Sequence, residues 1–212
     1  MPSGNRLTQK ETTETMEQRV VTLFHRSIEA TMNAGELLAP LIAEASEMIV
    51  HTLLAENKLL ICGNGLSGAL AQSFSAQLMG GFERERPGLP ALALNGDAIT
   101  TGTVARNHGR AESYARQVRA LGHPGDLLVI LSTDGRDSNL VQAIRAAHDR
   151  DMGVLALTGG EGEGDCTALL DVHDIELHVP SEVPSEVHQV HMLTLFCLCD
   201  LIDSSLFGGY ED

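Results

Sequence analysis

The spacing of apolar residues along this chain changes near residue 57. Between residues 14 and 56 they follow helical spacing in two groups, one over 16–28 and one over 37–53. These groups predict two amphipathic helices. After Asn57, short apolar runs alternate with helical stretches. The apolar runs predict five strands, at residues 58–62, 91–94, 127–131, 154–158 and 175–179.

Helical patterns fill the gaps between these strands, near residues 67–82, 112–121 and 139–151, and a last helix is expected over about 185–204. Strands alternating with helices predict α/β architecture: a doubly wound, five-stranded parallel sheet, here with an N-terminal helical pair. We expect one structural domain. Its parts are a flexible N-terminus (1–13), helices for oligomerisation (14–56), the α/β domain (57–204) and a C-terminal tail (205–212).

Two turns that follow predicted strands contain polar residues typical of a ligand crevice. In doubly wound sheets, ligands bind at the carboxyl ends of the strands near the topological switch, so the turns at 63–67 and 132–137 are expected to share one crevice. Asn64 and Ser67 of the first turn precede a helix and suit an anion. The second turn contains two carboxylates, Asp134 and Asp137, which would repel phosphate.

Composition narrows the function classes. The 212 residues are 43% apolar, enough for one well-cored domain. A net charge of -15 disfavours direct binding to nucleic acid or to an anionic membrane. No continuous apolar run reaches about 20 residues and the first residues are polar, so we expect a cytoplasmic protein without a membrane span. Four cysteines without a CxxC pair predict reduced, buried thiols.

Several motifs together resemble a known family. They are Cys62-Gly63-Asn64-Gly65, Ala71-Gln72, Leu89-Pro90-Ala91-Leu92-Ala93-Leu94, Asp97, Gln117-Val118-Arg119-Ala120-Leu121-Gly122, Pro124-Gly125-Asp126, Leu157-Thr158-Gly159 and His191. With them the chain resembles the sugar isomerase (SIS) family of phosphosugar-binding proteins. Within it, the chain resembles the branch that holds phosphoheptose isomerases and DnaA initiator-associating proteins.

The end of the chain resembles the initiator-associating group more than the isomerases. The similar segments are His191-Met192-Leu193-Thr194, Cys197-Leu198-Cys199-Asp200-Leu201-Ile202-Asp203 and Leu206-Phe207. This resemblance implies a homotetramer that binds the N-terminal domain of the replication initiator DnaA. It also implies that binding promotes assembly of DnaA at the chromosomal origin.

Isomerisation of an aldose to a ketose needs a general base, and an acid or metal at the enediolate oxygen. The resemblance places the isomerase groups at Ser73, Gln77, His188 and Phe196. A serine is a poor ligand for such a metal, a glutamine amide does not exchange protons at neutral pH, and phenylalanine does neither. His188 and His191 have no identifiable third ligand. We therefore expect no enzyme activity, no catalytic residue, no cofactor and no metal.

Leu206 and Phe207 lie between serine and glycine pairs. From pattern alone they are either an exposed docking pair or a contact that caps the last helix. The resemblance implies that they contact DnaA. Two alternatives remain open: a phosphoheptose isomerase acting on sedoheptulose 7-phosphate, and a sensor of a small phosphorylated sugar. The phosphosugar-binding residues would be Asn64, Ser67, Asp97, Ser132 and Thr133.

Overall fold

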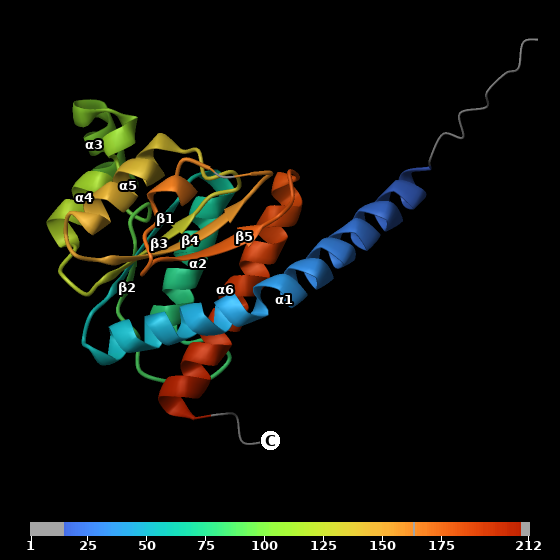
Figure 1. Ribbon diagram of the computed structural model, residues 1–212, viewed down its shortest axis with the longest axis horizontal. Helices are drawn as coiled ribbons and strands as arrows, with labels where there is room; N and C mark the ends of the chain where they lie inside the picture. Colours follow the sequence, from blue (N-terminus) through green and yellow to red (C-terminus); the bar gives the residue numbers. More distant parts are fainter. Residues whose placement is uncertain (1–14, 163, 209–212) are drawn as a thin grey trace, which may run out of the picture.

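A five-stranded parallel sheet forms the centre of the protein in the computed structural model, which describes residues 15–162 and 164–208 (Figure 1). The strands are β1 (Leu59–Gly63), β2 (Ala91–Ala93), β3 (Leu127–Leu131), β4 (Gly153–Gly159) and β5 (Ile175–Val179). Their order is β2-β1-β3-β4-β5, and every neighbouring pair is parallel. The predicted doubly wound α/β sheet is therefore confirmed. Its expected flexible N-terminus, residues 1–13, lies outside the described residues.

Helices cover both faces of the sheet. On one face lie α1 (Met16–Leu54), α2 (Gly65–Gly80) and α6 (Pro184–Phe207), and on the other lie α4 (Ala115–Leu121) and α5 (Ser138–His148). Alternate strand residues point to opposite faces, so Leu59 and Ile61 enter the first core while Leu60 and Cys62 enter the second. Burial on both faces explains why the central strands β1 and β3 are continuous apolar runs, whereas β5 at the edge alternates apolar with polar residues.

The N-terminal helical pair was a wrong prediction, because the structure has one helix of 39 residues, α1. A capping box starts it: Thr15 accepts a hydrogen bond from the Gln18 backbone, and the Gln18 side chain accepts one from the Thr15 backbone. The two apolar groups belong to one helix with different surroundings. The buried residues of α1 begin at Ala34, whereas Phe24 and Ile28 are 66% and 55% exposed in the earlier part of the helix. Figure 1 shows that this earlier part extends beyond the body.

The last helix also differs from the prediction. α6 continues through Leu206 and Phe207 and is capped by Gly208, so residues 205–207 belong to a helix and not to a tail. By length and composition alone, α1 and α6 could each cross a bilayer, contrary to the expectation from continuous apolar runs. However, α6 packs against both α1 and α2, which is the environment of a core helix.

One helix was missed. Residues Ala98–His108 form α3, which contains no buried residue and therefore carries no apolar stripe that a pattern could reveal. Two short 3-10 helices, Arg110–Glu112 and Thr167–Leu169, complete the described elements.

Candidate functional site

The candidate crevice lies where the strand order reverses, at the carboxyl ends of β1 and β3. Gly63 ends β1 beside Leu131 of β3, and α2 starts almost at once. A Cβ on Gly63 would lie 2.8 Å from the Ser67 carbonyl group and 3.0 Å from the Leu131 carbonyl oxygen. Only glycine fits there, so the turn brings α2 unusually close to the sheet.

Asn64 is held by a network that the sequence did not reveal. Its side chain and that of Asn139 exchange two amide hydrogen bonds of 2.9 Å. The Tyr114 hydroxyl donates to the Gly63 carbonyl oxygen at 2.7 Å and lies 3.3 Å from Asn64 Oδ1. Burial raises the pKa of Tyr114 above its usual range, so the phenol stays neutral and acts as a donor. Asn64 is thus fixed by contacts across the crevice, and its side chain does not cap α2.

Ser67 and His188 meet in the crevice, with the Ser67 hydroxyl oxygen 3.1 Å from His188 Nε2. Burial lowers the pKa of His188, which favours the neutral ring. One turn further along α6, His191 lies 2.9 Å from the Thr158 carbonyl oxygen through Nε2. Burial lowers the pKa of His191 to about 4, so a neutral ring donates to that carbonyl. Both imidazoles therefore serve as uncharged, fixed groups near neutral pH.

In the second turn, the Ser132 hydroxyl contacts other groups of the same turn. Ser132 is buried, and its hydroxyl oxygen lies 3.3 Å from Asp134 Oδ1 and 3.4 Å from Asp137 Oδ2. It also accepts a 3.0 Å hydrogen bond from the Gly135 backbone. Asp137 is the N-cap residue of α5, although its side chain makes no capping hydrogen bond. The two carboxylates thus surround the hydroxyl that a phosphate would need.

Thr133 lies in a different part of this edge. It lines a cavity of about 210 Å³ together with Asp134, Arg136, Glu161 and Glu182. Of these five side chains three are carboxylates, and one is a guanidinium. Anions are therefore disfavoured here as well.

The four positions that the resemblance assigns to the isomerase catalytic groups hold uncharged side chains, and each contacts a neighbouring side chain. They are Ser73, Gln77, His188 and Phe196. Gln77 Nε2 donates to the Ser73 hydroxyl at 3.3 Å, and the Cys199 thiol donates to Gln77 Oε1 at 3.4 Å. Burial raises the pKa of Cys199 to about 12, so this thiol is protonated. Phe196 stacks on Phe82, with the ring centroids 5.9 Å apart. Neither a base nor a metal ligand arises from Ser73, Gln77 or Phe196.

Asp97 has a structural role outside the two turns. It is the N-cap of α3 and accepts hydrogen bonds from the Ile99 and Thr100 backbones and from the Thr100 hydroxyl. The bonds from Thr100 hold the pKa of Asp97 below its usual range. Asp97 and Thr100 line a groove of about 590 Å³ beside β2, separate from the cavity that contains Thr133. No hydrogen bond joins Asp97 to the two crevice turns in the described part of the chain.

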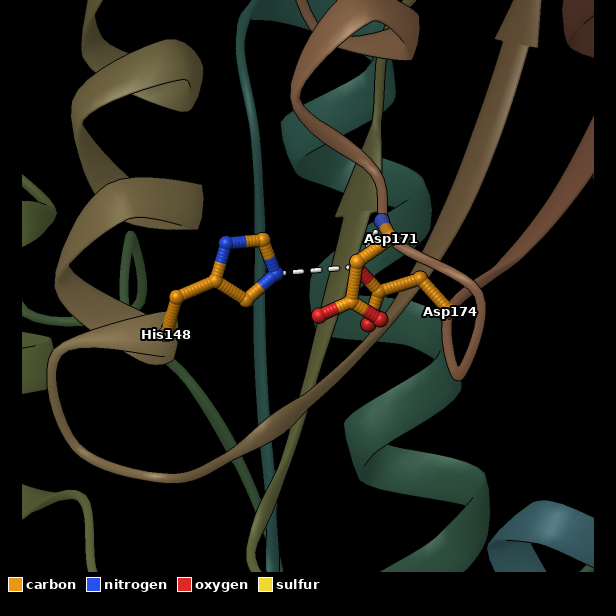
Figure 2. A group of neighbouring side chains, drawn as sticks. All are labelled: His148, Asp171 and Asp174. Carbon is orange, nitrogen blue, oxygen red and sulfur yellow. Dashed lines mark hydrogen bonds and ion pairs between the residues drawn. The ribbon is translucent and has the colours of Figure 1, made fainter.

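One group of three side chains among the described residues could hold a metal ion: His148, Asp171 and Asp174 (Figure 2). It lies at the amino ends of the strands, opposite the crevice, because Asp174 accepts a 2.8 Å hydrogen bond from the Val154 backbone at the start of β4. His148 Nε2 lies 2.8 Å from Asp174 Oδ2, as the dashed line shows. This group ties the end of α5 to β4 and β5, and it could not supply a metal to the crevice.

Leu206 and Phe207 are half-buried and pack against the core cluster beneath α1, α2 and α6. The sequence pattern allowed either an exposed docking pair or a contact that caps the last helix, and the structure contains the capping contact. Each side chain still keeps part of its surface exposed, so contact with a partner remains a prediction.

The comparisons with known proteins agree with this geometry. The SIS domain model matches residues 23–159 of the chain. The chain belongs to the SIS domain family. Its fold follows that of a solved phosphoheptose isomerase from Francisella tularensis, with a TM-score of 0.87 and 41% identity over 90% of this chain and 99% of that one.

The names of SIS relatives divide between two roles. The chain is 49% identical to a phosphoheptose isomerase from Chromohalobacter salexigens, over 92% of this chain and 98% of the relative. It is 45% identical to the DnaA initiator-associating protein DiaA from Cronobacter sakazakii, over 93% of this chain and 100% of the relative. Overall identity therefore does not separate an enzyme from an initiator-associating protein, and individual residues must decide.

Sequence reasoning found the two crevice turns of this SIS domain but not the residues that hold them. Tyr114 and Asn139 lie 50 and 75 positions from Asn64, so no local pattern links them. The one available signal was that Tyr114 is one of two tyrosines in a chain with only 3% aromatic residues. Cysteines were predicted correctly in the main: all four are free, three are buried, and Cys197 is half-buried.

Proposed function

We propose that this SIS protein is a noncatalytic, homotetrameric cytoplasmic factor that binds the N-terminal domain of DnaA and promotes its assembly at the chromosomal origin. The observation that carries the proposal is the neutral state of the isomerase positions, where Gln77 bonds to Ser73 and Cys199 and where Phe196 stacks on Phe82. Moving a proton between carbons needs a base together with an acid or metal at the enediolate oxygen, and His188, the one imidazole at these four positions, does not supply both. DiaA relatives at 45% identity support the partner.

Self-association is supported by the surface of α1. Met16, Phe24, Ile28 and Met32 are exposed by 55% to 84% where α1 extends beyond the body. A contiguous apolar surface of this kind marks an interface, and in a symmetric oligomer the partner is another copy of the chain. A tetramer would present four copies of the Leu206–Phe207 pair, and multivalency would hold several DnaA molecules together through weak single contacts.

Phosphoheptose isomerase activity is the second candidate, favoured by the relative at 49% identity and by the fold shared with solved isomerases. A sensor of a small phosphorylated sugar is related to it, because Asn64 and Ser67 remain at the start of α2. Against both stand Asp134 and Asp137 around the Ser132 hydroxyl.

Two measurements on the purified protein test this proposal. Calorimetric titration with the DnaA N-terminal domain should give saturable binding. An assay with sedoheptulose 7-phosphate and added zinc should give no turnover above the uncatalysed rate. Turnover together with absent DnaA binding would establish the enzyme and overturn the proposal.

A further inference from the structure

Two arginines from the segment between α2 and β2 hold the last turn of α6. Arg84 donates from its guanidinium to the carbonyl oxygens of Gly208 at 2.7 Å and Phe207 at 3.4 Å. The last carbonyl groups of a helix lack helical partners, so a cation at this end is favourable. Gly208 ends the helix with a φ of 85°, a conformation that glycine adopts without strain. The end of α6 is therefore fixed in place rather than frayed.

Arg86 holds the side chain of Phe207 as well as the end of α2. Its Cζ atom lies 5.8 Å from the centroid of the Phe207 ring, which is the geometry of a cation–π contact. Its terminal nitrogens donate to the carbonyl oxygens of Leu78 at 2.8 Å and Gln77 at 3.0 Å. Arg86 thus links two helix ends through one buried guanidinium.

Asp203 completes the arrangement from one turn earlier in α6. Its Oδ1 lies 2.6 Å from Arg86 Nε, and the two side chains are 0% and 1% exposed. The approach falls outside hydrogen-bond geometry, so this contact is an ion pair rather than a directed hydrogen bond. Within residues 15–162 and 164–208, the Asp203 carboxylate accepts no hydrogen bond. Its buried charge therefore depends on Arg86.

We propose that Arg86 and Asp203 are positioning residues for DnaA docking by Leu206 and Phe207, an inference that rests on the proposed function. Asp203 and Phe207 are four residues apart and lie on one face of α6. Arg86 contacts both, so it fixes the rotation of the last turn and the orientation of the Phe207 ring. An anchor that is ordered before binding loses less conformational freedom on binding, which strengthens the complex.

This role is separable from stability. Replacing both members of a buried ion pair with apolar side chains is often neutral for folding, whereas removing one member leaves an uncompensated charge. The double variant Arg86→Met, Asp203→Leu therefore removes the positioning contacts while retaining a packed core. Asp203→Asn serves as a second variant that keeps the shape of the side chain and leaves Arg86 without its counter-charge, while Arg86 retains its bonds to the Leu78 and Gln77 carbonyl oxygens. The control is Arg119→Met, Glu112→Leu, which removes an ion pair of 2.7 Å between α4 and the 3-10 helix before it, on the opposite face of the sheet.

Two readouts apply to each variant: amide hydrogen exchange over residues 204–208, and calorimetric titration with the DnaA N-terminal domain. Thermal unfolding and light scattering confirm that fold and assembly are retained. We expect exchange in this turn to rise, and DnaA affinity to fall, by about tenfold or more in the Arg86/Asp203 double variant, with smaller changes of the same sign in Asp203→Asn. The control variant should match the wild type.

Unchanged exchange and unchanged affinity in a folded double variant would overturn the positioning role. Faster exchange with unchanged affinity would also overturn it, because the ordered turn would then not matter for docking. If wild-type protein binds no DnaA domain, the proposed function fails, and the positioning role in docking fails with it. Exchange over residues 204–208 would then decide only whether the pair orders the turn.

Discussion

Arg86→Met should destabilise the protein strongly, because it leaves the Asp203 carboxylate buried without a counter-charge. Asp203 is 0% exposed, and among the described residues Arg86 is its ion-pair partner. Breaking a buried pair by removing one member costs about 3–5 kcal/mol.

The lost hydrogen bonds of Arg86 add little to this cost. The Gln77 carbonyl oxygen keeps a 3.0 Å bond from the Gly81 backbone, and the Leu78 carbonyl oxygen keeps a 2.9 Å bond from the Leu89 backbone. Neither carbonyl is therefore left unsatisfied. The expected loss stays at about 3–5 kcal/mol, which for a chain of this size lowers the melting temperature by roughly 10 °C.

Thermal and urea unfolding at one fixed protein concentration measure this loss, since self-association would otherwise shift the midpoint. The double variant Arg86→Met, Asp203→Leu should recover most of the stability. A loss of less than about 1 kcal/mol in the single variant would refute the reasoning, because the carboxylate would then be solvated or otherwise compensated.

Three further predictions concern other parts of the protein. Burial opposes the charge of Asp126, but hydrogen bonds from Lys58 outweigh it and hold the pKa of Asp126 below its usual range. Asp126→Asn should therefore lower stability at neutral pH, and urea unfolding should show the difference from wild type vanish as pH falls through that lowered pKa. Asn139→Ala should cost about 1–3 kcal/mol in urea unfolding, since it breaks the amide pair with Asn64. Added zinc should leave the melting temperature of the variant His148→Ala unchanged within about 1 °C, because this variant loses a ligand of the group outside the crevice and the crevice offers no ligand set; a saturable increase would contradict this.

The strands were predictable to within one residue at each end, because β1 and β3 are continuous apolar runs buried on both faces and β5 alternates apolar with polar residues. α1 was misread as two helices because residues 29–36, between its two apolar groups, include Glu29, Asn33, Gly35 and Glu36, which look like a break in the pattern. α3 gave no signal because none of its residues is buried.

The candidate site was predictable only where it is local. Asn64, Ser67 and the 132–137 turn follow strands, so their position at the sheet edge follows from the fold. Residues brought together by tertiary packing were not accessible from the sequence: Arg86 contacts Asp203 across 117 positions, and Ser67 meets His188 across 121. Leu206 and Phe207 could be named from the resemblance, but their half-buried state depends on these distant contacts.

The central claim is tested most directly by calorimetric titration of the DnaA N-terminal domain into wild-type protein and into the variant Leu206→Ala, Phe207→Ala. Val172→Ala is the control, since it truncates an apolar side chain that is 92% exposed in the loop before β5, outside α6. The account predicts saturable binding by wild type and control, and affinity weakened by about a hundredfold or lost in a double variant that keeps its assembly state. Equal binding by all three proteins would contradict the docking role of Leu206 and Phe207, and no binding by wild type would contradict the proposed function itself.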